Sequence, residues 1–142
     1  MDIQFLFKVF NFGVLIPWAI MIFFPRWSGT NVMLKSLFPV LIIAVSYLFL
    51  VLWDAFVSVG GTIDFTSFES IKEAFARDQV MLIGWMHYLA FDLFVGMWEF
   101  RDAQRISLPH LLLVPCLLLT LLFGPIGFVL YWVFSKWYNK IE

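Results

Sequence analysis

Charge is the scarcest property of this 142-residue chain: only 13% of its residues are charged, whereas 63% are hydrophobic. A soluble domain carries about 25% charged and roughly 45–50% apolar residues. A small soluble core cannot hide such an excess of apolar side chains, because a small domain has too much surface for its volume. The composition therefore argues against a soluble domain and predicts an integral membrane protein.

Cysteine is almost absent as well. The single cysteine, Cys116, excludes an internal disulfide and a cysteine-built metal site. The formal net charge of −1 offers no basic face, so we expect no nucleic-acid partner. Neither a nucleophile elbow nor a phosphate-binding glycine loop occurs. The start Met1-Asp2-Ile3-Gln4 lacks the basic region of a secretory signal, so we expect no cleaved leader.

Long apolar runs are what the chain does contain. Four of them are long enough to cross a hydrocarbon core of about 30 Å, over residues 5–24, 37–57, 80–100 and 108–132. We therefore predict an all-α fold: a four-transmembrane-helix bundle forming one integral membrane domain over residues 1–142. An even number of spans would place both ends of the chain on one side. In that four-span arrangement the two sides of the membrane would carry similar numbers of Lys and Arg residues. The positive charges therefore do not predict which side faces the cytoplasm.

The connector between the second and third apolar runs has a pattern of its own. Phe68, Ile71 and Phe75 recur at helical spacing, and charged residues occupy the opposite face. The preceding Thr66-Ser67 pair supplies a helix cap. These features predict a short amphipathic surface helix over about residues 67–77, lying on the membrane.

The third apolar run carries polar groups that a lipid-facing helix would not need. Ionisable side chains are costly in hydrocarbon, and those present usually face a partner, a cavity or a ligand. With each residue advancing about 100° around a helix, one stripe of this segment comprises Trp85, Tyr88, Leu89, Asp92, Gly96 and Glu99.

Asp92 is the strongest functional candidate of this stripe, because an aspartate near the middle of a bilayer must be protonated or paired. Tyr88, one turn earlier, is interpreted as a packing residue whose hydroxyl reaches Asp92. His87 lies about 140° around the helix from Asp92. It is either a hydrogen-bonded histidine that holds helices together or a proton donor, proton acceptor or metal ligand, with Asp54, Asp102 or His110 as partner.

The residues beyond the third run favour a simpler interpretation. Glu99, Arg101 and Arg105 are predicted to belong to a solvated loop with ordinary ion pairs. His110, which follows Pro109 at the start of the fourth helix, suits hydrogen bonding or metal ligation as well as plain burial at the interface.

Proline and glycine interrupt the fourth run, at Pro115 and in Gly124-Pro125-Ile126-Gly127. They predict a kinked helix, which either packs tightly or opens a groove. No His-x₃-His or Glu-x-x-His pair places two ligands on one helix face, so the sequence favours no particular metal site, and the metal and the cofactor are left open.

The polar run and its flanks form an extended pattern: Gly84-Trp85-x-His87-Tyr88-Leu89-Ala90-Phe91-Asp92-Leu93-Phe94-Val95-Gly96, Arg101-Asp102, Pro109-His110, and Pro115-Cys116-Leu117-x-Leu119-Thr120 followed by Gly124-Pro125-x-Gly127. This pattern resembles the abscisic-acid-deficient-four-like family of integral membrane proteins. The resemblance is carried mainly by the second half of the chain. Its plant member is a plastid protein required for making neoxanthin from violaxanthin, and relatives occur in bacteria and cyanobacteria. The resemblance implies a bacterial inner membrane or a photosynthetic membrane as the location.

The resemblance also implies chemistry. The plant reaction opens an epoxide and removes a proton to leave an allene, an isomerisation that needs an acid and a base. On this basis we expect Asp92 and His87 to be the acid–base pair, supported by Asp102 and His110. Aromatic side chains of the third run would bind the polyene: Trp85, Tyr88, Phe91 and Trp98.

A second hypothesis assigns no catalysis. The chain would then be a pigment- or lipid-binding accessory subunit of a larger membrane complex. Both hypotheses predict the same partners: the lipid bilayer, a carotenoid or other isoprenoid ligand, and either further copies of the chain or other membrane proteins. They differ in whether a new product forms.

Overall fold

The computed structural model describes residues 2–57 and 63–138, and these residues form helices and their connections only. The predicted all-α fold is thereby confirmed. In chain order the helices are α1 (Ile3–Gly13), α2 (Leu15–Phe23), α3 (Ser28–Ser36), α4 (Phe38–Val57), α5 (Phe68–Phe75), α6 (Asp78–Arg105), α7 (His110–Phe123) and α8 (Pro125–Tyr138).

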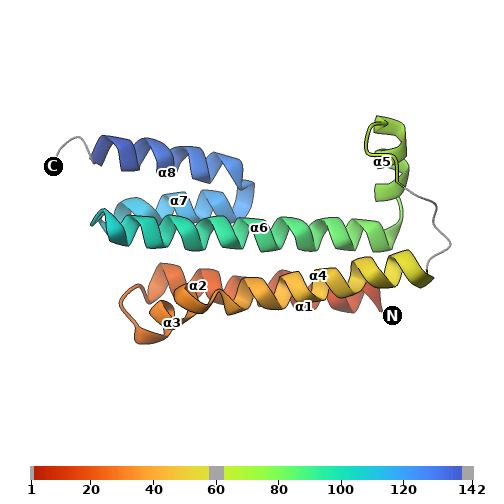
Figure 1. Cartoon of the computed structure of the whole chain (residues 1–142). Helices are drawn as coiled ribbons and strands as arrows, with labels where there is room; N and C mark the ends of the chain where they lie inside the picture. The colour runs from red at the N-terminus through yellow and green to blue at the C-terminus, as the bar shows by residue number, and fades with distance from the viewer. Residues whose placement is uncertain (1, 58–62, 139–142) are drawn as a thin grey trace.

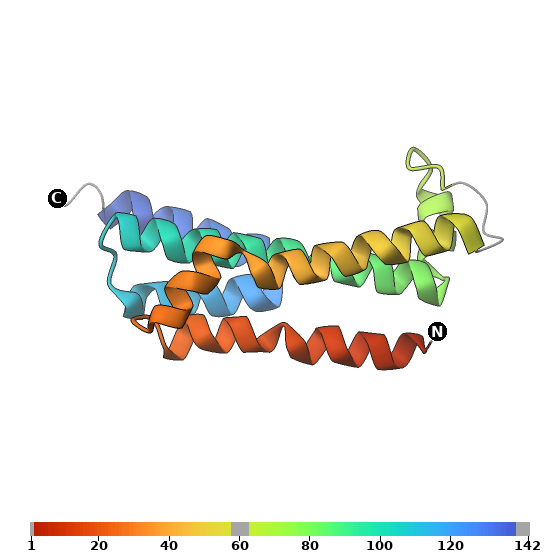
Figure 2. The same cartoon turned by 60° about the horizontal axis from the view of Figure 1, so that its bottom comes forward.

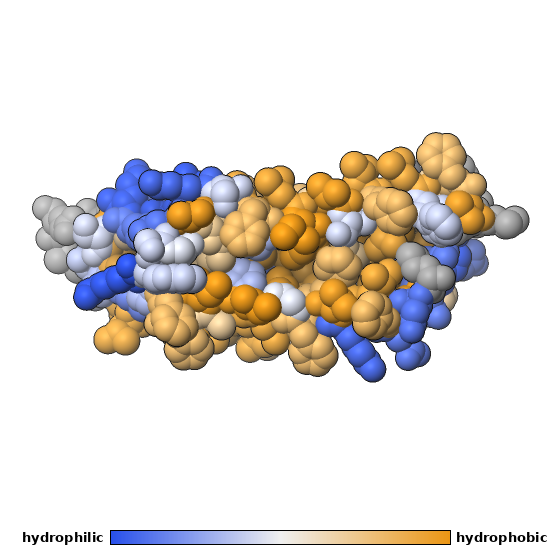
Figure 3. Space-filling view, turned by 90° about the horizontal axis from the view of Figure 1, so that it is seen from below, coloured by the Kyte–Doolittle hydropathy of each residue, from blue (hydrophilic) through white to orange (hydrophobic). Residues whose placement is uncertain are grey.

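Three helical stretches are long and apolar enough to cross a membrane: Ile3–Phe23, Ser28–Val57 and Asp78–Arg105. They correspond to three of the four predicted spans. The longest single helix, α6, is the centre of the molecule and contacts α1, α2, α4, α5, α7 and α8 (Figure 1). Figure 3 shows a face that is hydrophobic along its length, with hydrophilic residues gathered towards the two ends.

The predicted fourth span is wrong in its continuity. The segment 108–132 is not one helix, because the chain reverses at Gly124 and α8 folds back along α7 (Figures 1 and 2). Each of the two helices has 14 residues, or about 21 Å at 1.5 Å per residue. That is shorter than a hydrocarbon core of about 30 Å. The two helices thus form a hairpin that reaches about half-way along α6.

Local sequence explains the reversal. Gly124 has φ +44°, in the left-handed region that a residue without a Cβ adopts at little cost. Pro125 is the first residue of α8, where its missing N–H is not needed. The Gly124-Pro125 pair is therefore a helix end followed by a helix start, whereas the sequence interpretation took it for a kink.

The hairpin changes where the chain ends. Helix α1 begins at one end of the molecule and α8 finishes at the other (Figures 1 and 2). The expectation that both ends of the chain lie on one side is wrong for this arrangement, because it counted the hairpin as a crossing helix.

The predicted connector helix is α5. The Ser67 side chain caps it by accepting a hydrogen bond from the Ser70 backbone N–H at 3.3 Å. Just before it, the Asp64 carboxylate accepts hydrogen bonds from the Thr66 hydroxyl and backbone N–H, which hold the pKa of Asp64 below its usual value. The Phe75 ring packs over Gly84 of α6. The location of α5 on a membrane surface stays a prediction.

Candidate functional site

The side chains predicted to share one site fall into separate groups. All but one of them project from α6, and the structure distributes them over different faces of that helix and over its length. The groups are Trp85 with Tyr88 and Asp92, His87 with Phe91, Trp98 with Asp102, and His110 alone.

The first group surrounds Asp92, at the middle of the 28-residue α6. The hairpin tip ends beside this carboxylate: a Cβ placed on Gly124 would lie 2.7 Å from Asp92 Oδ1. Asp92 Oδ2 is buried and has no hydrogen-bond partner among the described residues, although the Tyr88 side chain lies close enough to interact with the carboxylate, as the sequence predicted. A buried carboxylate oxygen without a partner is costly, and such groups are concentrated at functional sites. Asp92 is therefore one of the candidates for a functional polar group in the described chain.

Two aromatic side chains continue this group towards the start of α6. The Tyr88 hydroxyl donates to the Leu122 carbonyl oxygen at 3.3 Å, so it also reaches the hairpin tip. The Trp85 ring stacks on Tyr88 with centroids 5.2 Å apart, and its indole N–H donates to Asn11 Oδ1 at 3.3 Å. Trp85, Tyr88 and Asp92 thus form one line beside the tip, which we call the central polar group.

His87 points elsewhere. Its side chain is exposed, its ring stacks on Phe91 at 4.6 Å, and it lies 5.8 Å from the ring of Tyr47 in α4. The structure therefore does not bring His87 and Asp92 together as an acid–base pair. The five-residue offset between them already separates the two directions by about 140° on one helix; His87 lies towards α4, whereas Asp92 lies beside the hairpin tip.

Glu99 is a residue that sequence reasoning missed. It was expected in a solvated loop, but it is 0% exposed, which contradicts that prediction. The Thr120 hydroxyl lies 3.0 and 3.1 Å from its two carboxylate oxygens. Because α6 continues to Arg105, Glu99 remains inside the helix and α7 covers it. The sequence feature that could have predicted this burial is the spacing of Glu99 and Asp92, which lie two helical turns apart on the same stripe of α6. Arg101 and Arg105 are exposed, as predicted.

Asp102 belongs to a structural cluster. It accepts a hydrogen bond from the Tyr131 hydroxyl at 2.7 Å and pairs with Arg105 at 2.6 Å. The Trp98 ring meets Tyr131 edge-on at 5.7 Å. These contacts hold α8 on α6 and use both carboxylate oxygens of Asp102, so they describe an anchor for the hairpin.

Replacing Tyr131 by phenylalanine tests this anchor. We expect the variant to lose about 1.5–3 kcal/mol of unfolding free energy, the usual contribution of a hydrogen bond to a charged group. The measurement is reversible unfolding of the purified protein in detergent. Tyr47→Phe is the matched control, because Tyr47 meets His87 through its ring, and this contact survives the change. Equal losses in both variants would contradict an anchoring role for the Tyr131 hydroxyl.

His110 lies far from Asp92, at the other end of α7. Its Nε2 is 2.9 Å from the Ile22 carbonyl oxygen, and its ring meets Phe100 edge-on at 5.9 Å. These contacts join the start of α7 to the end of α2. The sequence left hydrogen bonding, metal ligation and plain burial open for His110. These contacts support hydrogen bonding. Among the residues that the structure describes, no three His, Cys, Asp or Glu side chains gather closely enough to hold a metal ion.

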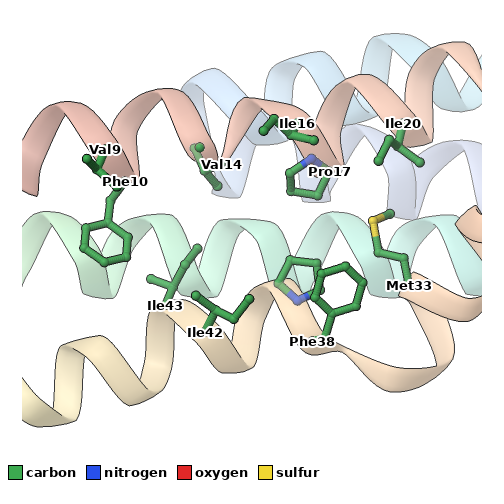
Figure 4. Close-up of a pocket in the computed structure, with 12 residues that line it drawn as sticks. Val9, Phe10, Val14, Ile16, Pro17, Ile20, Met33, Phe38, Ile42 and Ile43 are labelled. Carbon is green, nitrogen blue, oxygen red and sulfur yellow. The ribbon is translucent and has the colours of Figure 1, made fainter.

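A separate hollow lies between the first two candidate spans. Side chains of α1 and α2 face side chains of α3 and α4 across it (Figure 4), and its volume is about 260 Å³. Its lining is apolar, and none of it comes from α6, α7 or α8, so Asp92 does not open into it. The lining residues are Val9, Phe10, Gly13, Val14, Ile16, Pro17, Ile20, Met33, Phe38, Pro39, Ile42 and Ile43.

Comparison with known proteins adds one finding. No curated protein and no solved structure matches the chain. A family model described as ABA DEFICIENT 4-like does match, over residues 5–131. The match begins at Phe5, inside the first candidate span, and ends at Tyr131 in α8, so it includes the central polar group. Because it covers well over half of the 142 residues, this protein belongs to the ABA DEFICIENT 4-like family.

Proposed function

We propose that this protein is a membrane enzyme that isomerises a carotenoid or a related long isoprenoid by acid–base chemistry at Asp92. The family suggests a carotenoid-related role, and the three long apolar helices are compatible with a membrane protein. The observation that carries the proposal is the buried, unpartnered Oδ2 of Asp92 beside the hairpin tip. We place the three helices across a bacterial inner membrane or a photosynthetic membrane, as the family resemblance implies.

The short hairpin supports access to Asp92 from the lipid. It runs beside only one half of α6 (Figure 1), so the other half has no hairpin next to it. At the tip, Leu122 and Phe123 are 62% and 55% exposed. In this proposal a polyene dissolved in the bilayer lies against these apolar side chains. Its oxygen-bearing end then reaches Asp92, and Trp85 and Tyr88 flank it.

The chemistry needs a proton to be given and another to be taken. The Asp92 carboxyl group donates its proton to the epoxide oxygen as a carbon–oxygen bond breaks. The carboxylate that remains then removes a proton from the substrate carbon, and the electron pair of that C–H bond forms the allene. The acid is restored, and the product has the same atoms and the same oxidation level as the substrate. We assign both steps to Asp92, because His87 faces away from it.

A second candidate function rests on a different observation. The apolar hollow between α1–α2 and α3–α4 could hold a pigment or lipid chain without any chemistry. In that case the protein would be a binding subunit of a larger membrane complex or a homo-oligomer. The hollow is separate from Asp92, so the two functions can be tested independently.

The deciding experiment expresses this chain in a carotenoid-producing bacterium that accumulates an epoxidised carotenoid. Pigments are separated by chromatography and weighed by mass spectrometry. We expect a new pigment of unchanged mass, absent from the host that carries an empty vector. Unchanged pigments, with carotenoid co-purifying with the protein, would reject the enzyme and favour the binding subunit.

A further inference from the structure

The described charged residues are divided unequally between the two ends of the molecule. The α2–α3 connection, the end of α6 and the end of α8 all lie at one end of the molecule (Figure 1). Five cationic side chains lie there, and all are exposed. We call this the basic end: Arg26, Lys35, Arg101, Arg105 and Lys136.

Few negative charges oppose them. Among the described residues of the basic end, the acidic side chain is Asp102, which is already engaged by Arg105 and Tyr131. Glu99 lies inside the helix packing and not at the end. The basic end therefore presents a net positive surface to whatever lies beside it.

The opposite end has the reverse balance. It contains the start of α1, the helix α5 and the start of α6. Its described cationic residues are Lys8, Lys72 and Arg77. Its exposed acidic residues outnumber them: Asp2, Asp64, Glu69, Glu73 and Asp78.

We infer that the basic end faces the cytoplasm and lies against the anionic lipid headgroups of the cytoplasmic leaflet. Lys and Arg in the short connections beside membrane spans are retained on the cytoplasmic side, and the negative surface potential there attracts them. The α2–α3 and α6–α7 connections are both short. If residues 108–132 crossed the membrane as one helix, Lys136 would lie at the end opposite Arg26 and Arg101. The unequal distribution of cationic residues between the two ends therefore depends on the hairpin.

A hollow at the basic end suits a headgroup. It has a volume of about 330 Å³ and lies between Arg26, Gln104, Ser107 and His110. The Arg26 guanidinium and the Gln104 amide can donate hydrogen bonds to a phosphate oxygen. The Nε2 of His110 is already engaged with the Ile22 carbonyl oxygen, so Arg26 would provide the charge.

Cysteine labelling tests the orientation in intact bacteria. The native Cys116 is 0% exposed, so it should not react with the maleimide. Ser28→Cys places a thiol at the exposed first residue of α3, at the basic end, and Glu73→Cys places one at an exposed position of α5. A membrane-impermeant maleimide, added to cells with a permeabilised outer membrane, should label the α5 thiol several-fold more than the α3 thiol. Lysis should make the two equal. The reverse order would overturn the inference.

Vesicles test the headgroup contact. Purified protein should melt at a higher temperature in phosphatidylglycerol vesicles than in phosphatidylcholine vesicles. The difference should disappear when Arg26→Gln, Lys35→Gln and Arg101→Gln are combined. The matched control removes the same number of positive charges at the opposite end, by Lys8→Gln, Lys72→Gln and Arg77→Gln, and should retain the difference. Equal melting of the unmodified protein in both lipids, or equal effects of both variants, would contradict the contact.

Discussion

Replacing Asp92 by asparagine is expected to abolish pigment conversion while leaving the protein folded. Asparagine keeps the shape of the side chain beside Gly124 but can neither give nor take a proton in the reaction. General acid–base catalysis by one group contributes roughly 10²–10⁴-fold, so the new pigment should fall below detection. The measurement is product per amount of membrane-inserted protein, with the protein quantified by immunoblot.

Asp54→Asn is the matched control for this change. Asp54 also has a buried, unpartnered carboxylate oxygen, but it lies in a small hollow beside Gln79 and Leu82, away from the hairpin tip. Conversion should persist in this variant. Product at the unmodified level in Asp92→Asn would show that Asp92 is not the acid or the base.

Glu99→Gln separates the two carboxyl groups of the seam between α6 and the hairpin. A glutamine can still accept the hydrogen bond from Thr120, so we expect this variant to fold and to retain conversion. If Glu99→Gln abolishes conversion and Asp92→Asn does not, the proton-transferring group is Glu99 and the assignment to Asp92 is rejected.

Replacing Gly127 by alanine is expected to open the hairpin. A Cβ at this position would collide with the backbone nitrogen and hydroxyl of Thr120, and backbone atoms cannot turn aside as a flexible side chain can. Forcing extra volume into a packed interior costs about 1–3 kcal/mol. We expect a loss of at least that size in the free energy of unfolding, measured by denaturant titration in detergent.

Gly13→Ala is the control for Gly127→Ala. A Cβ on Gly13 meets nothing within 4 Å, so the same chemical change there should leave stability unchanged or slightly raised. Displacing Thr120 should also break its hydrogen bond to the Glu99 carboxylate. We therefore expect Gly127→Ala to lower the free energy of unfolding by more than the steric collision alone would. Similar stability of the two variants would mean that α7 and α8 do not approach each other as closely as the structure places them.

Hydropathy and helical periodicity were sufficient to predict much of this fold. The apolar runs 5–24, 37–57 and 80–100 correspond to candidate spans, and the amphipathic pattern at residues 67–77 located α5. These features depend on residues close together in the chain. The stripe through Tyr88, Asp92 and Glu99 is equally local, because a helix advances about 100° per residue.

The fourth apolar run shows where local patterns stop being informative. Hydropathy reports how apolar a segment is, and a helix that crosses is as apolar as a hairpin that turns back. A glycine at a helix end followed by a proline at a helix start is a known boundary signal, and Gly124-Pro125 carried it. Whether this pair produces a kink or a chain reversal depended on whether α8 could pack on α7. The absence of a side chain at Gly127 allows that packing.

The chain's own sequence determined its class, its helices and the direction in which each polar side chain leaves its helix, because these follow from composition and from backbone geometry over a few residues. Only the tertiary structure decided that Glu99 is enclosed, that His87 lies against α4 while Asp92 lies beside the hairpin tip, and that Lys136 joins the other cationic residues at one end. Each of these depends on which distant segments lie alongside α6, and local sequence patterns do not specify that.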